Sequence, residues 1–343
     1  MSRSLLVTLV VFAISGCSAP RETAIPSGQA LNNLETKLAS PPATGNVYVA
    51  NWYNSSVAVY SPGGTSKLRT ITAGVSYPNA LGINKSGSLF VGNYGAPSGS
   101  LTSSITVYSP GNSQPGRTIV QGVVGPYAIA FDASGKLYVA NYGGPSVTVY
   151  GGGSNTPVLT ITQGVRSPEA LAFDKNANVY VANWSNSTVT AYAPGKGKPS
   201  KKINTQVFRP NALAIDAAQR LYVANNAANT VTIYKPGHGT SPSKIAKGIR
   251  KPIALVSTSS GELYVLNYAN NTVSIYSEQT LELERTISSG IACPTAMARS
   301  SSGLLYVANS CPSGVSIYSA SGSKPMRTLS KGLDGPDAIA IAP

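Results

Sequence analysis

The sequence predicts an all-β fold, a seven-bladed β-propeller whose blades are four-stranded antiparallel sheets. Three observations predict it: a unit of about 42 residues occurs seven times, each unit carries four short β-strand patterns, and the chain ends on a partial unit. The composition agrees, since charged residues make up only 11% of the 343 residues, while Gly and Pro number 34 and 24. So few charges exclude coiled coils, large helical bundles and charged disordered tails.

Three landmarks define the repeat. An aliphatic-aromatic-Val-small-Asn pattern ends at Asn51, Asn93, Asn141, Asn183, Asn225, Asn267 and Asn309. A Val-Thr-Val-Tyr-like pattern ends at Tyr60, Tyr108, Tyr150, Tyr192, Tyr234, Tyr276 and Tyr318. A proline precedes an Ala-Leu-Ala-Phe-Asp-like pattern at Pro78, Pro126, Pro168, Pro210, Pro252, Pro294 and Pro336. We interpret residues present in all seven copies as structural, and we expect each asparagine to hold the hairpin loop that follows it.

A single unit shows the predicted strands. In residues 126–164 they cover 127–132, 137–141, 146–150 and 158–162, which are rich in Val, Ile, Thr and Tyr and are bounded by Gly, Pro, Ser and Asn. A four-stranded unit cannot cover both of its faces alone, so neighbouring units must stack and close into a ring.

The two ends of the repeat region predict how the ring closes. The region opens with a strand of the second type at 46–51 and ends with a strand of the first type at 337–342. We therefore expect the C-terminal strand to complete blade 1.

Bulky and small residues alternate in the first strand of every unit. One position holds Leu81, Ile129, Leu171, Leu213, Leu255, Met297 and Ile339, and the position before it holds alanine in all seven units. Alternation puts the two positions on opposite sheet faces. The bulky face of one blade is therefore expected to fill the small face of its neighbour.

The repeat resembles that of the YVTN/NHL-type propellers of exported bacterial proteins. The resemblance covers residues 43–343 and rests on the Tyr-Val-Ala-Asn tetrapeptides at 48–51, 138–141, 180–183, 222–225 and 306–309, in which Ala stands where the family has Thr. It implies the architecture but no single activity, because propellers of this kind include lyases, lactonases and binding modules.

The N-terminus predicts export. Met1-Ser2-Arg3-Ser4 and an apolar run from Leu5 to Ile14 form a signal-peptide pattern, and the following Ser15-Gly16-Cys17 resembles the bacterial lipobox. We predict a signal peptide over 1–16, a lipidated Cys17 with a flexible tether over 17–42, and the propeller over 43–343. The resemblance implies a lipid anchor in the cell envelope, at the outer membrane in a Gram-negative host. The alternative is ordinary cleavage nearby with an unmodified Cys17.

Strand directions place the loop before each Pro and the loop after each Asn on one face of the ring, here called the Asn–Pro face. Aromatic rings interleaved with Arg and carboxylates on this face suit the recognition of a glycan, peptide or protein. The candidate ligand-binding residues are Trp52, Tyr77, Tyr94, Tyr127, Tyr142, Arg166, Glu169, Trp184, Arg209, Tyr268 and Asp337. We therefore predict a non-catalytic, monomeric binding or scaffold module with no cofactor. The alternative is that the aromatic residues only cap the seams between blades.

An enzyme is the second hypothesis. The resemblance to streptogramin lyases implies a metal-dependent His and Glu, but the one histidine, His238, is expected on the opposite face with no acidic residue near it in sequence. Lactonase-type propellers hold calcium through a Glu/Asn/Asp set in the channel. Here Glu169, Asn79, Asn211 and Asp337 occupy equivalent positions, so a weak divalent-metal site is the alternative.

The two remaining cysteines, Cys293 and Cys311, lie in loops on the same face of one blade. Because export favours disulfide formation, we predict a disulfide between them, and the alternative is two free thiols.

The net charge of +14 is unevenly placed, because residues 196–251 hold eleven Lys and Arg and a single acidic residue. We predict a basic patch of Lys196, Lys198, Lys201, Lys202, Lys244, Lys247, Arg250 and Lys251. For an exported protein, anionic lipid head groups or acidic envelope polymers are the expected partners, and nucleic acid is not. The alternative is a solvated surface without a partner.

Overall fold

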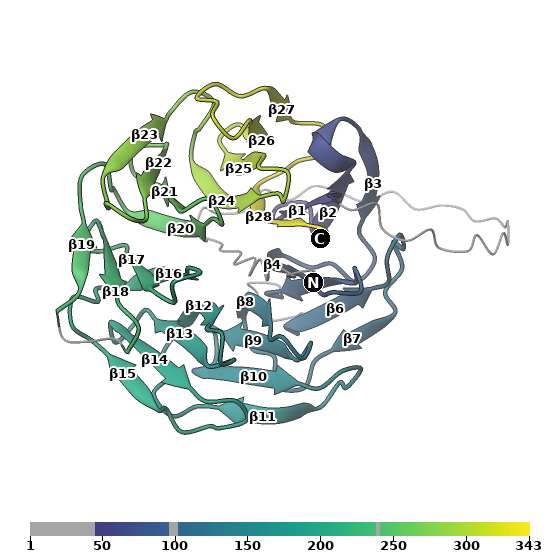
Figure 1. The fold of residues 1–343 in the computed structure, drawn as a ribbon. Coiled ribbons are helices and arrows are strands. Elements are labelled where there is room, and N and C mark those ends of the chain that lie inside the picture. Colours follow the sequence, from purple (N-terminus) through teal and green to yellow (C-terminus); the bar gives the residue numbers. More distant parts are fainter. Residues whose placement is uncertain (1–44, 96–101, 238–240) are drawn as a thin grey trace, which may run out of the picture.

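The computed structural model describes residues 45–95, 102–237 and 241–343. These residues form 28 strands in seven four-stranded sheets and one short 3-10 helix, η1 (Pro62–Gly64). The sheets are arranged as a ring, and we call the central axis that their innermost strands surround the channel (Figure 1). The predicted seven-bladed propeller is confirmed. The predicted signal peptide, Cys17 and tether lie outside the described residues.

In blades 2 to 7 the chain runs from the channel to the rim, and in blade 1 the last strand of the chain is the innermost one. The innermost strands are β28 (Pro336–Ile341), β4 (Pro78–Ile83), β8 (Pro126–Phe131), β12 (Pro168–Phe173), β16 (Pro210–Ile215), β20 (Pro252–Ser257) and β24 (Pro294–Arg299). The second strands are β1 (Val47–Asn51), β5 (Leu89–Asn93), β9 (Leu137–Asn141), β13 (Val179–Asn183), β17 (Leu221–Asn225), β21 (Glu262–Asn267) and β25 (Leu305–Ser310). The third strands are β2 (Ser56–Tyr60), β6 (Ser104–Tyr108), β10 (Ser146–Tyr150), β14 (Thr188–Tyr192), β18 (Thr230–Tyr234), β22 (Thr272–Ser277) and β26 (Ser313–Tyr318). The outermost strands are β3 (Lys67–Ile71), β7 (Arg117–Ile119), β11 (Pro157–Ile161), β15 (Lys201–Ile203), β19 (Ser243–Ile245), β23 (Leu283–Ile287) and β27 (Arg327–Leu329).

The C-terminal strand closes the ring as predicted. Strand β28 pairs antiparallel with β1, with Ile339 opposite Val49, so blade 1 joins the two ends of the propeller (Figure 1). Backbone hydrogen bonds from Gly45 and Ala342 extend this pairing beyond the strands.

Bulky residues of one blade fill the small face of the preceding blade. Ile129 of blade 3 packs with Ala80 of blade 2 in one buried cluster. A Cβ atom added at Gly82 of blade 2 would lie 2.7 Å from the Ile129 side chain, so this position has no room for one. The predicted interlocking of neighbouring blades is confirmed.

The repeated Asn and Tyr hold the connections between blades. In blade 3 the Asn141 side-chain oxygen accepts the Val124 N–H (3.0 Å), and its amide donates to the Gly122 carbonyl (3.1 Å). The buried Tyr150 hydroxyl donates to the Gln121 carbonyl (2.7 Å). All seven asparagines accept the equivalent N–H. The expectation that they hold the following hairpin loop is borne out in part, because in six blades the amide donates to the Ser or Thr that ends this loop, as from Asn141 to Ser146 (3.1 Å). The loop whose backbone groups they bond, however, lies before the blade and links it to its neighbour.

The low charge content follows from the stacking of the blades. The three inner strands of each blade are almost wholly buried, and exposed positions are found only in the outermost strands. Most charged side chains therefore lie at the rim or in the loops, and the exceptions on inner strands are Glu169, Glu262, Arg299 and Asp337. Among the described residues no helix is long and apolar enough to cross a membrane.

Candidate functional site

Each innermost strand carries one extra residue at its Asn–Pro end. In blade 4, Pro168 pairs with Asn183 and Ala170 pairs with Ala182, so Glu169 has no partner across the ladder. Such a β-bulge redirects the side chain of the extra residue, and bulges are common beside functional sites. The same bulge places Asn79, Tyr127, Glu169, Asn211, Ile253, Thr295 and Asp337 as a ring of buried residues around the channel.

Glu169 and Asn211 are neighbours in this ring. The Asn211 amide donates a hydrogen bond of 2.5 Å to a Glu169 carboxylate oxygen, across the seam between blades 4 and 5. Burial raises the pKa of Glu169 well above its usual range, and the bond from Asn211 opposes the rise in part. The two side chains thus form a buried polar pair, held by this hydrogen bond, beneath the Asn–Pro face.

Three oxygen atoms of the ring are buried without a hydrogen-bond partner among the described residues. They are Asn79 Oδ1, Asn211 Oδ1 and Asp337 Oδ2. Burial also raises the pKa of Asp337 well above its usual range. Because an unpaired buried oxygen is costly, these atoms indicate a place where a ligand or water completes the hydrogen bonding.

A cavity of about 270 Å³ opens from this ring onto the Asn–Pro face. Its lining comes from four consecutive blades, blades 3 to 6: Tyr127, Tyr142, Glu169, Trp184, Asn211, Asn226, Lys251 and Tyr268. Glu169 and Asn211 are buried, whereas Tyr268 is 40% exposed, so the lining runs from the channel to the surface. We call these eight residues the face pocket.

Aromatic rings form the walls of the face pocket. The rings of Tyr127 and Tyr142 lie 5.3 Å apart on one side. On another side the Arg209 guanidinium lies 5.6 Å from the centre of the Trp184 ring. Burial raises the pKa of the Tyr127 hydroxyl well above its usual range, with a further rise from the charge of Glu169.

A second aromatic group lies outside the pocket. Trp52 packs against Tyr77 (5.4 Å) and Tyr94 (5.8 Å) at the junction of blades 1 and 2. These three residues cap a seam, which is the alternative that the sequence left open for all the aromatic candidates. The two tryptophans of the chain therefore lie in different surroundings.

The structure brings together part of the predicted ligand set. Tyr127, Tyr142, Glu169, Trp184 and Tyr268 line the face pocket. The other predicted residues have different places: Arg166 and Arg209 are exposed on loops, and Asp337 belongs to the buried ring. Sequence reasoning missed Asn226 as a lining residue, although Asn226 occupies the position after the repeated Asn that is aromatic in five of the seven units.

The residue before each repeated proline adopts a left-handed backbone conformation. Five of the seven are not glycine: Tyr77, Ser167, Arg209, Lys251 and Cys293, with φ between 44° and 46°. Side chains rarely tolerate this region, so the surrounding contacts must impose it. At Lys251 the N–H donates to Asn229 (2.7 Å) and the carbonyl accepts from Tyr268 (3.1 Å). The loops that carry Arg209 and Lys251 are thus fixed in direction.

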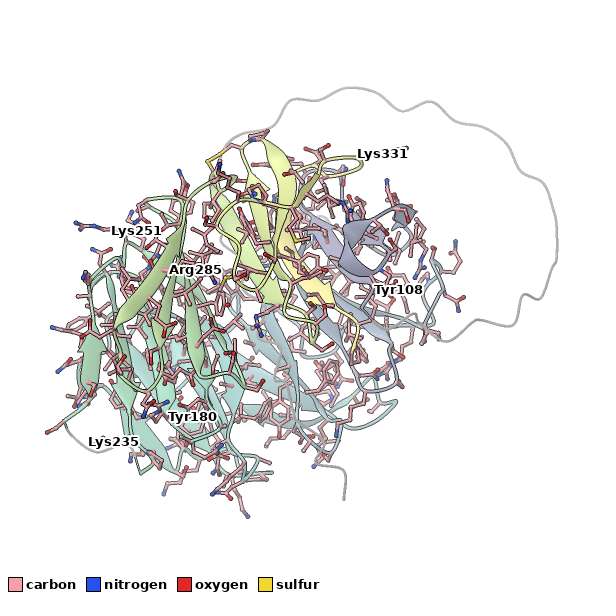
Figure 2. The ribbon with its side chains drawn as sticks, turned by 45° about the horizontal axis from the view of Figure 1, so that its top comes forward. Tyr108, Tyr180, Lys235, Lys251, Arg285 and Lys331 are labelled. Atoms are coloured by element: carbon pink, nitrogen blue, oxygen red, sulfur yellow. A yellow bond between two sulfur atoms is a disulfide. The ribbon has the colours of Figure 1, made fainter. Side chains whose placement is uncertain are left out.

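The predicted basic patch is divided in space. Lys201 and Lys202 lie on β15 at the rim, with Lys196 and Lys198 in the loop before it, and Lys244 lies on β19. Lys247, Arg250 and Lys251 instead lie in the loop that enters blade 6 on the Asn–Pro face. Figure 2 shows Lys235 and Lys251 at opposite ends of one side of the molecule. Only Lys251 lines the face pocket.

The structure contains the predicted disulfide between Cys293 and Cys311, with Cα atoms 5.6 Å apart. It joins the loop before β24 to the loop after β25 on the Asn–Pro face of one blade. This covalent link reinforces the same loop pair that the hydrogen bond from Ser310 N–H to the Cys293 carbonyl (3.0 Å) joins.

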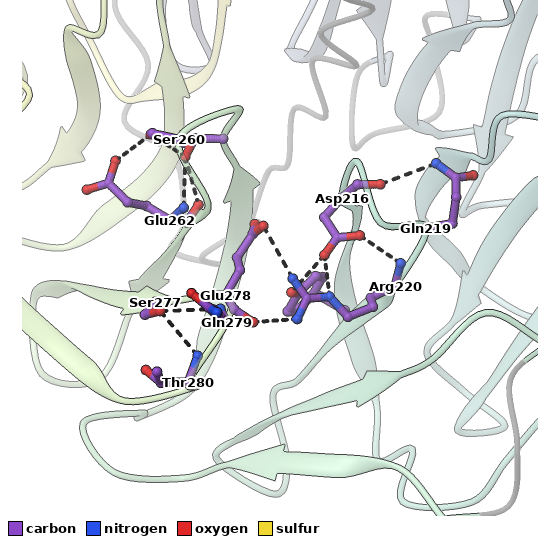
Figure 3. Close-up of polar contacts among 11 residues, drawn as sticks. Asp216, Gln219, Arg220, Ser260, Glu262, Ser277, Glu278, Gln279 and Thr280 are labelled. Atoms are coloured by element: carbon purple, nitrogen blue, oxygen red, sulfur yellow. Dashed lines mark hydrogen bonds and ion pairs between the residues drawn. The ribbon is translucent and has the colours of Figure 1, made fainter.

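The opposite face carries a separate charged network (Figure 3). Arg220 lies between Asp216 (2.5 Å) and Glu278 (3.7 Å) and links blade 5 to blade 6. Burial raises the pKa of Glu278 to about 7, and nearby Asp216 adds to the rise. We interpret this network as a cross-link between blades.

No group of three or more His, Cys, Asp or Glu side chains in the described part of the chain is placed to hold a metal ion, and His238 lies outside that part.

No known protein family matches the chain, and no curated protein does. Solved structures are similar in fold. The periplasmic gluconolactonase of Pseudomonas aeruginosa is 15% identical, with a TM-score of 0.71 over 87% of this chain and 99% of that one. A functionally unknown protein from Desulfotomaculum acetoxidans is 14% identical (TM-score 0.70, 87% and 99% covered). Kuenenia stuttgartiensis hydrazine synthase is also 14% identical (TM-score 0.68, 86% and 99% covered). At such low identity these similarities show the fold alone.

Proposed function

We propose that this protein binds a saccharide of the bacterial cell envelope in the face pocket, as an exported lipoprotein of the YVTN/NHL-type repeat propellers. The Tyr-Val-Ala-Asn tetrapeptides support the family, and the lipobox-like Ser15-Gly16-Cys17 supports the anchor. On this account the propeller is held at the membrane by lipid on Cys17. Its partner is then a glycan or glycosylated component of the envelope.

The arrangement of Trp184, Tyr268 and the Glu169–Asn211 pair carries the proposal. Aromatic faces stack against the apolar face of a sugar ring, while hydroxyl groups need fixed hydrogen-bond partners. The pocket offers aromatic walls above a carboxylate and an amide that already bond each other. Asn211 Oδ1 is buried without a partner among the described residues, so it is available to accept a hydroxyl proton.

A lactone hydrolase is the second candidate. The buried carboxyls of Glu169 and Asp337 favour it, because burial raises the pKa of both well above the usual range, and a carboxylate with a raised pKa is a stronger general base than an ordinary one. The fold similarity to a gluconolactonase agrees with this candidate.

The oxygen atoms of the ring also fit a divalent metal in chemical type. Glu169, Asn79, Asn211 and Asp337 would hold a calcium ion, since calcium takes carboxylate and amide oxygens. Such an ion would polarise a lactone carbonyl. Hydrolysis of a sugar lactone that is lost in Glu169→Gln, together with calcium-dependent melting, would favour the enzyme over the binding module.

A glycan array tests the proposal. The full chain is applied beside Trp184→Ala, which alters the pocket, and Trp52→Ala, which alters the aromatic group at the seam of blades 1 and 2. We expect a glycan signal that Trp184→Ala loses and Trp52→Ala keeps. No glycan bound by the folded wild type, or a signal that only Trp52→Ala loses, would contradict the face pocket as the binding site.

A further inference from the structure

Four cationic side chains lie on loops of the Asn–Pro face in blades 4 to 6; of these, Lys251 lines the face pocket and Arg209 contacts its Trp184. Arg166, Arg209, Arg250 and Lys251 come from the loops that enter blades 4, 5 and 6, and all four are exposed. Among the described residues none of their side chains has a hydrogen bond or an ion pair; Arg209 has the ring of Trp184 as its neighbour. Their charges therefore remain available to a ligand.

Acidic side chains do not balance these cations. The loops of blades 4 to 6 on the Asn–Pro face cover 162–167, 184–187, 204–209, 226–229, 246–251 and 268–271, and they contain no Asp or Glu. Asp174 and Asp216 belong to turns on the opposite face. The acidic residue of the pocket itself is Glu169, which is buried. A cluster of like charges without counter-charges attracts an anion and raises its local concentration.

The rim lysines have a different explanation. Lys201, Lys202 and Lys244 lie on outermost strands, whose free edges could pair with another chain. Charged side chains, lysine above all, protect such edges against pairing. The four cations of the Asn–Pro face lie on loops, so edge protection does not account for them.

The position of these cations defines how a ligand would lie. The Arg209 guanidinium is 5.6 Å from the Trp184 ring, and Lys251 lines the pocket together with Tyr268. The left-handed backbone at Arg209 and Lys251 fixes both loops. A sugar ring against Trp184 would therefore present its substituents to a guanidinium and an ammonium group. A guanidinium suits carboxylate, phosphate and sulfate groups because it offers paired donors in a fixed plane.

We propose that the ligand of the face pocket is an acidic saccharide, whose sugar ring stacks on Trp184 and whose anionic group is bound by Arg209 and Lys251. This inference rests on the proposed saccharide binding and adds the charge of the ligand to it. The buried Glu169 does not balance these cations, because its carboxylate accepts a hydrogen bond from Asn211 and burial, which raises the pKa of this carboxyl, disfavours its charged form.

Isothermal titration of the full chain tests the inference. The probes are a trigalacturonate, a neutral galactose trisaccharide, glucose 6-phosphate, a sulfated disaccharide and a polyglutamate peptide. The pocket variant is Arg209→Gln with Lys251→Gln, and the matched control is Lys202→Gln with Lys244→Gln at the rim. Both pairs remove two exposed positive charges, so thermal melting is expected to show both variants folded.

We expect at least one anionic sugar to bind at least ten-fold more tightly than the neutral trisaccharide. The pocket variant should lose most of this preference, and the rim variant should keep it. The uronate, phosphate and sulfate probes then identify the anionic group. Tighter binding at low salt should accompany the preference.

Three outcomes would overturn the inference. Equal binding of neutral and acidic sugars would leave the proposed saccharide binding intact and remove only the charge requirement. Polyglutamate bound as well as the acidic sugars, or affinity lost in the rim variant, would point to a non-specific basic surface. Binding of none of the sugars by the folded protein would contradict the inference and the proposed function together.

Discussion

Asn211 donates a hydrogen bond of 2.5 Å to Glu169, the residue that occupies the same bulge one blade earlier. The residues that all seven repeats share stabilise the fold. At the bulge position, by contrast, two neighbouring blades carry different polar residues, which lie side by side in the ring. Both are buried, with 4% of each exposed. We therefore regard this pair as the clearest departure from the repeat and as the base of the binding site.

The pair should be coupled energetically. A double-mutant cycle with Glu169→Ala and Asn211→Ala should give a coupling free energy of unfolding of about 1.5–3 kcal/mol, as for a hydrogen bond to a charged or strongly polar partner. Urea denaturation of the four proteins measures it. Additive effects of the two substitutions would show that the two side chains do not interact.

Glu278 should make the stability depend on pH. Its folded pKa of about 7 lies above the ordinary glutamate value of about 4.3. The stability that comes from protonated Glu278 is therefore complete below pH 4.3 and is lost as the pH rises through 7. Between pH 4 and pH 8 the wild type should lose about 2–3 kcal/mol relative to Glu278→Gln. A difference in unfolding free energy that stays constant over this range would show that Glu278 titrates normally.

Ile129 should be a large contributor to the packing between blades 2 and 3. It is 3% exposed and fills the space beside Ala80 and Gly82. Ile129→Ala should cost about 2–5 kcal/mol in the free energy of unfolding, since it leaves a cavity at the seam. Val158→Ala is the matched control, because Val158 is 62% exposed and should change stability by less than about 0.5 kcal/mol. Equal effects in chemical denaturation would contradict the interlocking of blades.

The closing strand should be indispensable. Removal of residues 336–343 leaves the β1 edge unpaired and uncovers the seams on both sides of blade 1. We expect this shortened chain to lose cooperative thermal unfolding, whereas a chain without Pro343 alone should melt like the wild type. Similar melting curves for both shortened chains would mean that the ring does not depend on this closure.

The sequence was sufficient to predict the architecture because the same pattern of strands and turns occurs in it seven times. The spacing of Asn, Tyr and Pro located the strands, and the alternation of Ala80 with Leu81 and its equivalents predicted the packing of the blades. Closure followed from the first and last strand patterns. The backbone partners of the asparagines could not be predicted, because Asn141 bonds a loop 17 and 19 residues earlier in the chain.

The binding site was only partly predictable, because it depends on which blades are neighbours and where each strand bulges. Sequence patterns placed Trp52 and Trp184 at the same repeat position, yet Trp52 packs on Tyr77 and Trp184 lines the pocket. The difference comes from the residues that each ring meets on the adjoining blade. Similarly, Lys251 belonged to a basic stretch of sequence, but only the turn of the chain between β19 and β20 brings it to the pocket.

The most direct test of saccharide binding in the face pocket uses the two tryptophans of the chain as reporters. In Trp52→Phe the remaining emission comes from Trp184 in the pocket, and in Trp184→Phe it comes from Trp52 at the seam between blades 1 and 2. Titration with trigalacturonate, or with the tightest glycan from the array, should change the emission of Trp52→Phe in a saturable way. It should leave the emission of Trp184→Phe unchanged. A saturable change in Trp184→Phe without one in Trp52→Phe would contradict the account and place the ligand at the other aromatic group.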